Sequence, residues 1–571
     1  MSSGQRRRSS GPLLPALRFL FWVVVALVEQ RGAATLSQPP HILFLLADDL
    51  GWNDVSFHNG GEGQLGTNTS RIDKLCASGT RLDQYFTNPI CTPSRASILT
   101  GRHVIRYGLQ HGSISDNRPT HLPVDEVLLP QLLRDAGYTT WMLGKWHLGG
   151  AYPNVGALRA VDANLRSAHD LMPMSRGFDH FYGHLTVHID GWSHVLNSDC
   201  DPRQLWVGPC GHDWHRNNES CPEDAGVKGT SEGFTAHLLV RELADLLKRR
   251  RRSTVKKPLF VYVPFHMVHG PLQCPKSYLA PFAHIVDIRR RKKAGMLAVL
   301  DEAVANMTGL FRAHGLWRDT LAIFTSDNGA PSMRGGGSNW PLRGQKHDLW
   351  DGGVRVPACV VGGSARLGVP AGVRTRAIVA HLDWLPTLLG RATAGDDAAR
   401  AKRGADAKAL DGFDVWESIV GAPTVASPRY ELLHNVEPPS NEHDAVSALR
   451  MVLPSLNSYG TAQANRTWKL LSFANGSKVL IDTENDESES RDVSAQNART
   501  TRFMSQRLGE WASEAAPCWG NPTHGFDCDK HPPADREFNP LYWGPEQSSC
   551  PNPSATAGGK CSRALFKVMG N

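Results

Sequence analysis

Long hydrophobic runs are scarce in this chain. Beyond the run from residue 19 to 28, no segment of its 571 residues looks long and apolar enough to cross a membrane, which takes roughly 20 residues. It also lacks internal repeats, extended low-complexity tracts and any recognisable nucleic-acid reader motif, so we expect neither a stable membrane span nor a nucleic-acid partner. With 41% apolar and 20% charged residues the composition is that of a globular protein, and length alone predicts three or four domains.

The N-terminus has the pattern of a secretory signal. Three arginines at 6–8 precede the apolar run, and Ala33-Ala34 offers a small-residue cleavage neighbourhood. The alternative is an uncleaved type II anchor, but the run is far shorter than a membrane span. We therefore predict a cleaved signal and a lysosomal or extracellular protein, a choice that the sequence leaves open.

The segment Cys91-Thr-Pro-Ser-Arg95 predicts the start of a helix. Thr92 can cap that helix, and Pro93 is tolerated as its first residue. Cys91 would then precede a helix N-terminus, which favours an anion, and Arg95 would add a permanent cation. The alternative is a buried or disulfide-bonded cysteine before an ordinary helix. Together the features indicate chemistry on a sulfate or phosphate ester.

Short apolar runs that end in polar residues predict a large doubly wound α/β domain. Three such runs are 41–47 before Asp48-Asp49, 258–265 before His266 to His269, and 321–326 before Asp327-Asn328. Amphipathic stretches at 126–137 and 234–249 lie between them. Because ligands bind at the carboxyl ends of parallel strands, we expect these polar side chains to meet at one edge.

The C-terminal part predicts a smaller α+β domain. Residues 392–409 have the composition of a loop, and strands at 468–473 and 477–482 flank Asn475-Gly476, a pair that suits a tight turn with positive φ at both positions. A helix at 494–513 follows. The predicted units are a signal peptide at 1–35, a catalytic domain at 36–425, an α+β subdomain at 426–515 and a Cys-rich extension at 516–571.

The acidic clusters predict a calcium site. Asp48, Asp49, Asp327 and Asn328 offer oxygen donors, which Ca²⁺, or less favourably Mg²⁺, prefers, whereas zinc prefers Cys and His. A single Asp pair after a strand could instead cap a helix or form a turn, but a second pair at an equivalent strand end favours the metal.

Two further strings add cations. Lys145 and His147 alternate, so in an extended chain both would face one site. Lys346 closes the segment that begins at Trp340. Each alone would more often be a surface or packing residue.

These strings resemble the type I sulfatases in the same chain order, from about residue 40 to 500. The segment from Cys91 to Thr100-Gly101-Arg102 is similar to that family's signature. The strings at 108–111, 268–272 and 339–344 are most similar to the arylsulfatase B, I and J branch, which includes N-acetylgalactosamine-4-sulfatase.

The resemblance implies an alkaline-phosphatase-like fold and a specific site. Cys91 would be converted to formylglycine (3-oxoalanine) by the formylglycine-generating enzyme during biosynthesis. One calcium ion per subunit would be bound by Asp48, Asp49, Cys91, Asp327 and Asn328. The catalytic residues would be Cys91, Arg95, His147 and His269, with Lys145, His269 and Lys346 binding the substrate. His269 is preferred over His266 because only His269 stands in the family's H-x-P-L context.

The predicted function is hydrolysis of sulfate esters on a glycan of the glycosaminoglycan type, such as N-acetylgalactosamine 4-sulfate, or of an aryl sulfate. The alternatives are a phosphodiesterase or phosphonate-ester hydrolase of the same superfamily, and a catalytically silent, secreted glycan-binding protein. The chain departs from its relatives in a longer segment between Gly149 and Arg176, in Asp351 where Glu is usual, and in the stretch after Cys518.

Cysteines, glycosylation sequons and charge agree with secretion. Setting Cys91 aside leaves ten of 11 cysteines, an even number, with Cys200 and Cys210 close enough to close a small loop and four more crowding 518–561. Five N-x-S/T sequons begin at Asn68, Asn218, Asn306, Asn465 and Asn475. The net charge is +7, and the basic runs at 248–252 and 289–293 are either solvated helix faces or a surface that attracts a sulfated glycan.

Overall fold

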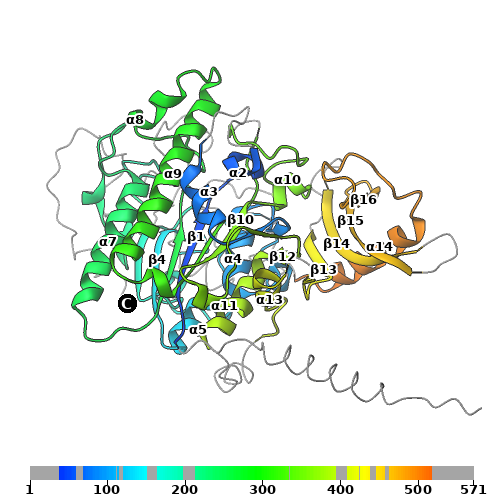
Figure 1. The fold of residues 1–571 in the computed structure, drawn as a ribbon, viewed down its shortest axis with the longest axis horizontal. Helices are drawn as coiled ribbons and strands as arrows, with labels where there is room; N and C mark the ends of the chain where they lie inside the picture. Colours follow the sequence, from blue (N-terminus) through cyan, green and yellow to red (C-terminus); the bar gives the residue numbers. More distant parts are fainter. Residues whose placement is uncertain are drawn as a thin grey trace, which may run out of the picture.

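The structure is a computed structural model of the 571-residue chain. It describes residues 38–59, 68–110, 112–114, 120–150, 162, 164–196, 212–332, 335–393, 408–422, 425–436, 445–456 and 462–516. A large mixed sheet with helices on both faces forms the main body, and a separate antiparallel sheet lies beside it (Figure 1). The predicted fold class is confirmed.

Parallel strands form the centre of the large sheet. β1 (His41–Ala47) lies between β8 (Leu259–Pro264) and β9 (Thr320–Ser326), and β4 (Thr139–Lys145) pairs with β8. The register sets Ala47 opposite Ser326, so β1 and β9 end side by side. The polar residues that follow these two strands are therefore brought together.

Shorter strands complete the sheet on both sides. The order is β11-β2-β10-β9-β1-β8-β4-β5-β6-β7. The added strands are β2 (Thr80–Leu82), β5 (His180–His184), β6 (His215–Arg216), β7 (Glu219–Ser220), β10 (Ala358–Gly362) and β11 (Val373–Thr375). β10 runs antiparallel to both of its neighbours, and β3 (Tyr85–Phe86) pairs with β12 (Val379–Ala380) in a small second sheet.

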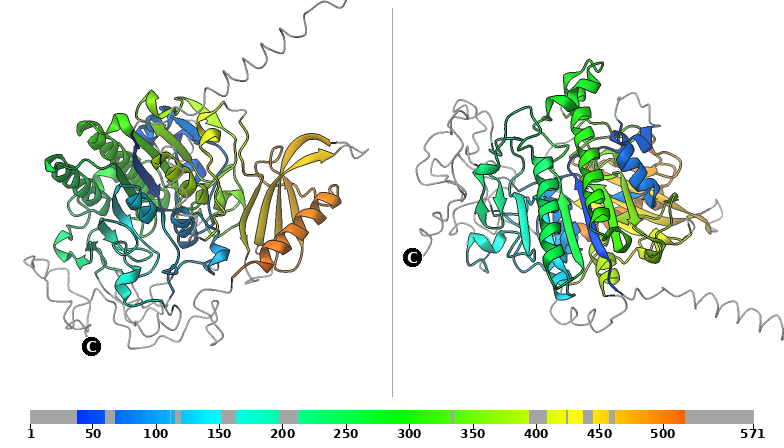
Figure 2. Two further views of the ribbon diagram at one scale, coloured as in Figure 1. Left: turned by 90° about the horizontal axis from the view of Figure 1, so that it is seen from below. Right: turned by 60° about the vertical axis from the view of Figure 1, so that its left-hand side comes forward.

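Helices cover both faces of the sheet because β1 is apolar on both (Figure 2). Ile42, Phe44 and Leu46 belong to one buried cluster and Leu43 and Leu45 to the other, as the alternation of a strand requires. One cluster packs against α4 (Cys91–Thr100), α5 (Leu129–Asp135) and α11 (Trp384–Ala392), and the other against α3 (Ser70–Ala77), α7 (Thr235–Arg252) and α9 (Ile288–Ala313). The shorter helices are α2 (Ser56–Asn59), α8 (Lys276–Leu279), α10 (Asp351–Val354) and α13 (Trp416–Val420).

Helix α9 corrects one expectation. By length and composition this 26-residue helix could cross a membrane, although the sequence was expected to hold no such segment beyond residue 28. In the structure 67% of its most apolar stretch is buried, and it packs between α3, α7 and the sheet. Its apolar composition is that of a core helix.

The basic runs do not form one surface. α7 and α9 each lead into a parallel strand, so they point the same way, and the run at 248–252 lies at the opposite edge of the sheet from the start of α9. Part of the second run is buried: Arg290 pairs with Asp54 at 2.7 Å, and Lys293 is 1% exposed. Both runs were expected to be exposed, but of the two only the run at 248–252 is largely so.

The C-terminal sheet is antiparallel, with α14 (Ala498–Ser513) packed on it. Its strands, in order, are β13 (Glu431–Val436), β14 (Ala445–Leu456), β15 (Ala462–Phe473) and β16 (Lys478–Asp482). The predicted hairpin joins β15 and β16, but only Gly476, at φ 82°, has positive φ in the turn. The expectation that Asn475 shares this conformation is wrong, because the loop is longer than a two-residue turn and Phe473 pairs with Ser477.

A disulfide and a buried free thiol bear on the expectation that the ten cysteines other than Cys91 form pairs. Cys76 in α3 and Cys359 in β10 are joined, 283 residues apart in sequence. Cys274 is a buried free thiol, so the even count did not mean complete pairing. Cys200, Cys210 and the C-terminal cysteines lie outside the described residues. Of the five sequons, the four at Asn68, Asn306, Asn465 and Asn475 begin at exposed asparagines, and Asn218 is half-buried.

A buried ionic network joins the C-terminal sheet to the body that holds the large sheet. Asp351, at the start of α10, accepts hydrogen bonds from Arg450 of β14 and from Lys469 of β15, the latter at 2.7 Å. Lys469 also lies 2.7 Å from Glu489, which accepts from the backbone N–H of Asp351. Asp351, one of the departures noted in the sequence, is therefore the centre of this contact.

Replacing Lys469 with Met is expected to lower the free energy of unfolding by about 3–5 kcal/mol. The substitution removes one cation from a pair that is 0% exposed and leaves Glu489 buried without its partner. Urea denaturation followed by circular dichroism measures the change. Lys478→Met, at an exposed lysine of the neighbouring strand β16, is the matched control. A loss below about 1 kcal/mol would show that the network is dispensable.

Candidate active site

Three carboxylates converge where β1 and β9 end. Asp48 and Asp49 follow β1, Asp327 follows β9, and each is at most 2% exposed. Gly329 lets this corner close: a Cβ atom there would lie 1.9 Å from the carbonyl oxygen of Gly352. So many buried carboxylates are stable only when cations surround them.

Three cations supply that charge. Arg95 donates to Asp327 from Nε at 3.0 Å and from Nη2 at 2.8 Å. Lys145 Nζ lies 2.7 Å from Asp48 Oδ2, and Lys346 Nζ lies 2.8 Å from Asp49 Oδ1.

The carboxylates respond differently to this environment. Burial alone would raise the pKa of Asp49, but Lys346 and His269 outweigh it and lower that pKa to about 2. Burial and the nearby Asp48 instead raise the pKa of Asp327 to about 6. The corner is therefore rich in negative charge and gains from any further cation.

The oxygen donors of this corner fit a divalent cation. Asn328 Oδ1 is buried without a hydrogen-bond partner among the described residues, while its Nδ2 donates to Asp49 Oδ1 at 2.7 Å. Ligand atoms of Asp48, Asp49, Cys91 and His269 all lie within 4.8 Å of one another. An orphaned amide oxygen beside clustered carboxylates is the donor set that Ca²⁺ takes. Asp48, Asp49, Asp327 and Asn328 thus meet as the sequence predicted.

Cys91 opens helix α4 at the edge of this cluster. Its Sγ lies 3.5 Å from Asp48 Oδ1, and the residue is 1% exposed. Burial, and then the charge of Asp48, raise the pKa of the Cys91 thiol above its ordinary range. Because the thiolate is the nucleophilic form of cysteine, an unmodified Cys91 is a poor nucleophile here.

The predicted cap of this helix is wrong. Cys91 is itself the first residue of α4, which Ile90 precedes without a side-chain cap. Thr92 Oγ1 donates instead to the carbonyl oxygen of His147 at 3.1 Å and accepts from the N–H of Ile114. Thr92 thus ties α4 to the segment that carries His147.

His147 does not share an extended segment with Lys145, although the alternation of the two residues predicted that it would. Lys145 ends β4, but His147 has a left-handed backbone with φ 56°, so the two do not share an extended segment. His147 Nε2 lies 2.9 Å from the carbonyl oxygen of Ile114, and Nδ1 has no partner in the described part of the chain. Burial and Lys145 lower the pKa of His147 well below its ordinary value, so the ring is neutral near pH 7.

His269 lies on the solvent side of the carboxylates. Its Nδ1 donates to the carbonyl oxygen of Gly270 at 2.7 Å, and its Nε2 lies 3.7 Å from Asp49 Oδ2. Its side chain is 13% exposed, so it can meet a ligand that enters from outside. Burial and Lys346 lower the pKa of His269 well below its ordinary value.

The structure adds residues that the sequence did not indicate. Lys293 of α9 donates to the carbonyl oxygens of Asp49 at 2.9 Å and of Val268 at 3.0 Å, joining the loops after β1 and β8. Lys293 belongs to the basic run at 289–293, and no local signal separates it from the half-buried Arg291 and Lys292.

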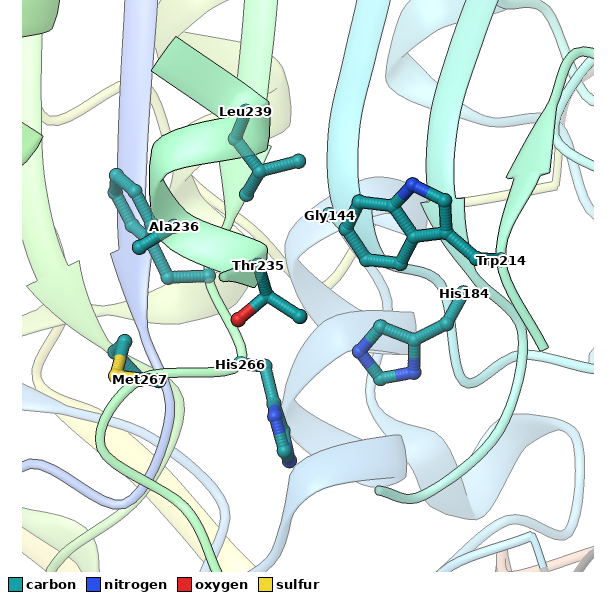
Figure 3. A pocket seen from close by; sticks show the side chains of 9 residues that line it. Gly144, His184, Trp214, Thr235, Ala236, Leu239, His266 and Met267 are labelled. Carbon is teal, nitrogen blue, oxygen red and sulfur yellow. The ribbon is translucent and has the colours of Figure 1, made fainter. Parts of the chain in front are cut away.

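His184 and His266 form a buried pair beside the site. Their ring centroids are 5.2 Å apart, and they line a pocket with Trp214 and Thr235 (Figure 3). Among the described residues, neither ring nitrogen of His184 has a hydrogen-bond partner. His266 Nε2 lies 3.0 Å from the carbonyl oxygen of Gly270.

Comparison with known proteins identifies the family. A family model described as Sulfatase matches residues 40–394. The chain belongs to the sulfatase family. Arylsulfatase J of Mus musculus is 37% identical over 72% of this sulfatase-family chain, and the match spans 61% of that relative's own length. Arylsulfatase A of Homo sapiens is 32% identical over 71% of the chain and 72% of that protein.

Solved structures of other proteins share the fold. Ps i-CgsB in complex with k-i-k-neocarrahexaose superposes with a TM-score of 0.66 at 25% identity, covering 84% of this sulfatase-family chain and 94% of that one. The phosphonate monoester hydrolase of Agrobacterium radiobacter superposes with a TM-score of 0.53 at 17% identity, over 83% of this chain and 96% of that one, which shows the fold alone. The predicted family and its alkaline-phosphatase-like architecture are confirmed.

Proposed function

We propose that the protein hydrolyses sulfate esters on a glycan, using formylglycine at position 91 and one bound Ca²⁺. The observation that carries this proposal is the convergence of Cys91 with three buried carboxylates, Asn328 and the cations Arg95, Lys145 and Lys346. The three cations suit a sulfate ester, whose oxygens carry negative charge.

Residue 91 is the proposed nucleophile. Formylglycine, as its hydrate, supplies two hydroxyls, one to attack sulfur and one whose deprotonation later releases sulfate. Burial raises the pKa of the Cys91 thiol, so the unmodified side chain would be neutral and a poor nucleophile at this position.

The surrounding residues have separate roles in the proposal. Calcium would be held by Asp48, Asp49, residue 91, Asp327 and Asn328, and when bound it withdraws charge from the ester and the nucleophile. Arg95, Lys145 and Lys346 neutralise the charge that develops on the sulfate oxygens. His269 gives its proton to the departing alcohol oxygen, and His147 accepts a proton from residue 91.

Two similar proteins support a glycan substrate. Ps i-CgsB was crystallised with neocarrahexaose, a carbohydrate. N-acetylgalactosamine-6-sulfatase of Canis lupus familiaris is named for a sulfated sugar and is 27% identical over 70% of this chain. We propose a glycosaminoglycan-type substrate, with N-acetylgalactosamine 4-sulfate as the first candidate, met in the lysosome or outside the cell after secretion.

Mass spectrometry of the peptide that contains residue 91 tests the proposal most directly. Protein from a secretory cell competent for the conversion should carry the aldehyde in place of the thiol. Finding only cysteine would favour a catalytically silent glycan-binding protein. Assays of an aryl sulfate and an aryl phosphodiester side by side would separate a sulfatase from the phosphodiesterase alternative, which a preference for the phosphodiester would support.

Activity is expected to be highest below neutral pH. Burial and Lys346 lower the pKa of His269, so its proton is present only in acid. As the acid of the reaction, His269 loses this function when the pH rises through its lowered pKa, and kcat/KM should fall from about pH 5 to pH 8. The pH profile of kcat/KM is measured with a glycan sulfate and with 4-nitrophenyl sulfate. The second substrate should show a weaker fall, because its good leaving group needs less protonation. A flat profile with the glycan would contradict the role of His269.

A further inference from the structure

Four imidazole rings form a row from the interior to the mouth of the site. His184 and His266 have ring centroids 5.2 Å apart, His266 and His269 5.7 Å, and His269 and His188 6.2 Å. His184 is 0% exposed and His266 5%, whereas His188 is exposed. The rings of His188 and His269 stack, with 22° between their planes. His188 is therefore the outermost member, directly beside the proposed acid.

The loop that carries His188 is firmly held. The neighbours Ile189 and Asp190 are buried, at 0% and 5% exposure. The Asp190 carboxylate accepts from the backbone N–H groups of Trp192 at 3.0 Å and Ser193 at 2.9 Å. The backbone therefore holds His188 in a defined place, and its exposed imidazole can meet a ligand.

Gln273 links this loop to the segment of His269. Its Nε2 donates to Asp190 Oδ2 at 2.7 Å, and its Oε1 accepts from the N–H of Gly191 at 2.8 Å. Gln273 lies three residues after Gly270, whose carbonyl oxygen accepts from His269. The positions of His188 and His269 are therefore set relative to each other by the same short segment.

The neighbours of His269 indicate where the leaving group would lie. The His269 ring has Asp49, Gly270 and His266 as inner neighbours, and the exposed His188 ring stacks on it. An alcohol that takes its proton from His269 therefore carries the rest of its sugar ring past His188.

We propose that His188 is a specificity-determining residue that forms the outer wall of a leaving-group subsite and hydrogen-bonds a hydroxyl of the sugar ring bearing the sulfate. This inference rests on the proposed function. A neutral imidazole has one donor and one acceptor nitrogen, which matches a sugar hydroxyl that can both donate and accept. A simple aryl sulfate presents a ring without hydroxyls and cannot make this contact.

Steady-state kinetics of His188 variants tests the proposal. The substrates are chondroitin disaccharides sulfated at position 4 or 6 of N-acetylgalactosamine, and 4-nitrophenyl sulfate. For His188→Ala we expect kcat/KM for the accepted disaccharide to fall about 10-fold, mainly through KM, with 4-nitrophenyl sulfate changed less than about 2-fold. His188→Gln should restore most of the disaccharide activity because its amide can hydrogen-bond, and His188→Phe should not.

The control and the opposing outcomes are distinct. His314→Ala changes a histidine at the far end of α9 and should leave both substrates unaffected. Equal losses for disaccharide and aryl sulfate in His188→Ala would overturn the inference, because they indicate a general structural role. A wild-type enzyme that cleaves the aryl sulfate but neither disaccharide would overturn both this inference and the proposed glycan, and leave the sulfatase activity standing. Cleavage of no sulfate ester at all would overturn the proposed function itself.

Discussion

Cys91→Ser is expected to reduce the enzyme to one slow turnover, with sulfate left covalently on residue 91. Serine is not the residue that the cysteine-directed conversion uses, and it offers one hydroxyl where the hydrate offers two. Calcium and Arg95, whose guanidinium lies beside Asp48 and Asp327, would remain to assist the attack on sulfur. The sulfated serine then has no second hydroxyl whose deprotonation can expel the sulfate.

Intact-protein mass spectrometry after incubation with 4-nitrophenyl sulfate detects the trapped ester, and the assay follows the released phenol. Cys274→Ser is the matched control, because it changes another buried free thiol, outside the carboxylate cluster, and should leave turnover near the wild-type rate. Sustained turnover by Cys91→Ser close to the wild-type rate would show that the aldehyde is dispensable, and the proposed mechanism would fail.

Asp327→Asn is expected to lower kcat/KM by about 100-fold or more and to weaken calcium binding. The substitution removes a negative charge from the oxygen cluster while keeping its shape. Asp327 also accepts two hydrogen bonds from Arg95, so the neutral side chain would hold that guanidinium less firmly. Both effects act on the step in which charge develops on the sulfate.

Calcium titration calorimetry and kinetics measure the two consequences separately, and circular dichroism checks the fold. Asp319→Asn, just before the other end of β9, is the matched control, because Asp319 is half-exposed and pairs with Arg366. If Asp327→Asn retains wild-type activity in the presence of a calcium chelator, the proposed metal site is wrong.

The central strands and the acidic edge could be predicted because they follow local rules. A short apolar run marks a buried parallel strand, and the residues after it belong to the edge where ligands bind. β1, β8 and β9 begin and end within one residue of the predicted runs. Their order in the sheet sets Asp48 and Asp327 side by side, 279 residues apart in sequence.

Other features depend on contacts that no local pattern encodes. Thr92 looked like a cap, but the segment at Ile114 and His147 offered its hydroxyl better partners. Lys293 stands among five consecutive basic residues, and only the packing of α9 decides which of them is buried. The disulfide between Cys76 and Cys359 joins segments 283 residues apart. His188 can be recognised as a candidate only from its contact with His269, which lies in another loop.

The burial of Cys91 also bears on whether its proposed modification comes before or after folding. At 1% exposure, at the start of a helix and enclosed by segments from distant parts of the chain, residue 91 lies beyond the reach of another enzyme once folding is complete. In the proposed function, conversion would therefore have to take place on the nascent or still extended polypeptide. Under the same proposal, a molecule that folds with cysteine at this position would stay inactive, and the fraction of active enzyme would depend on the relative rates of modification and folding.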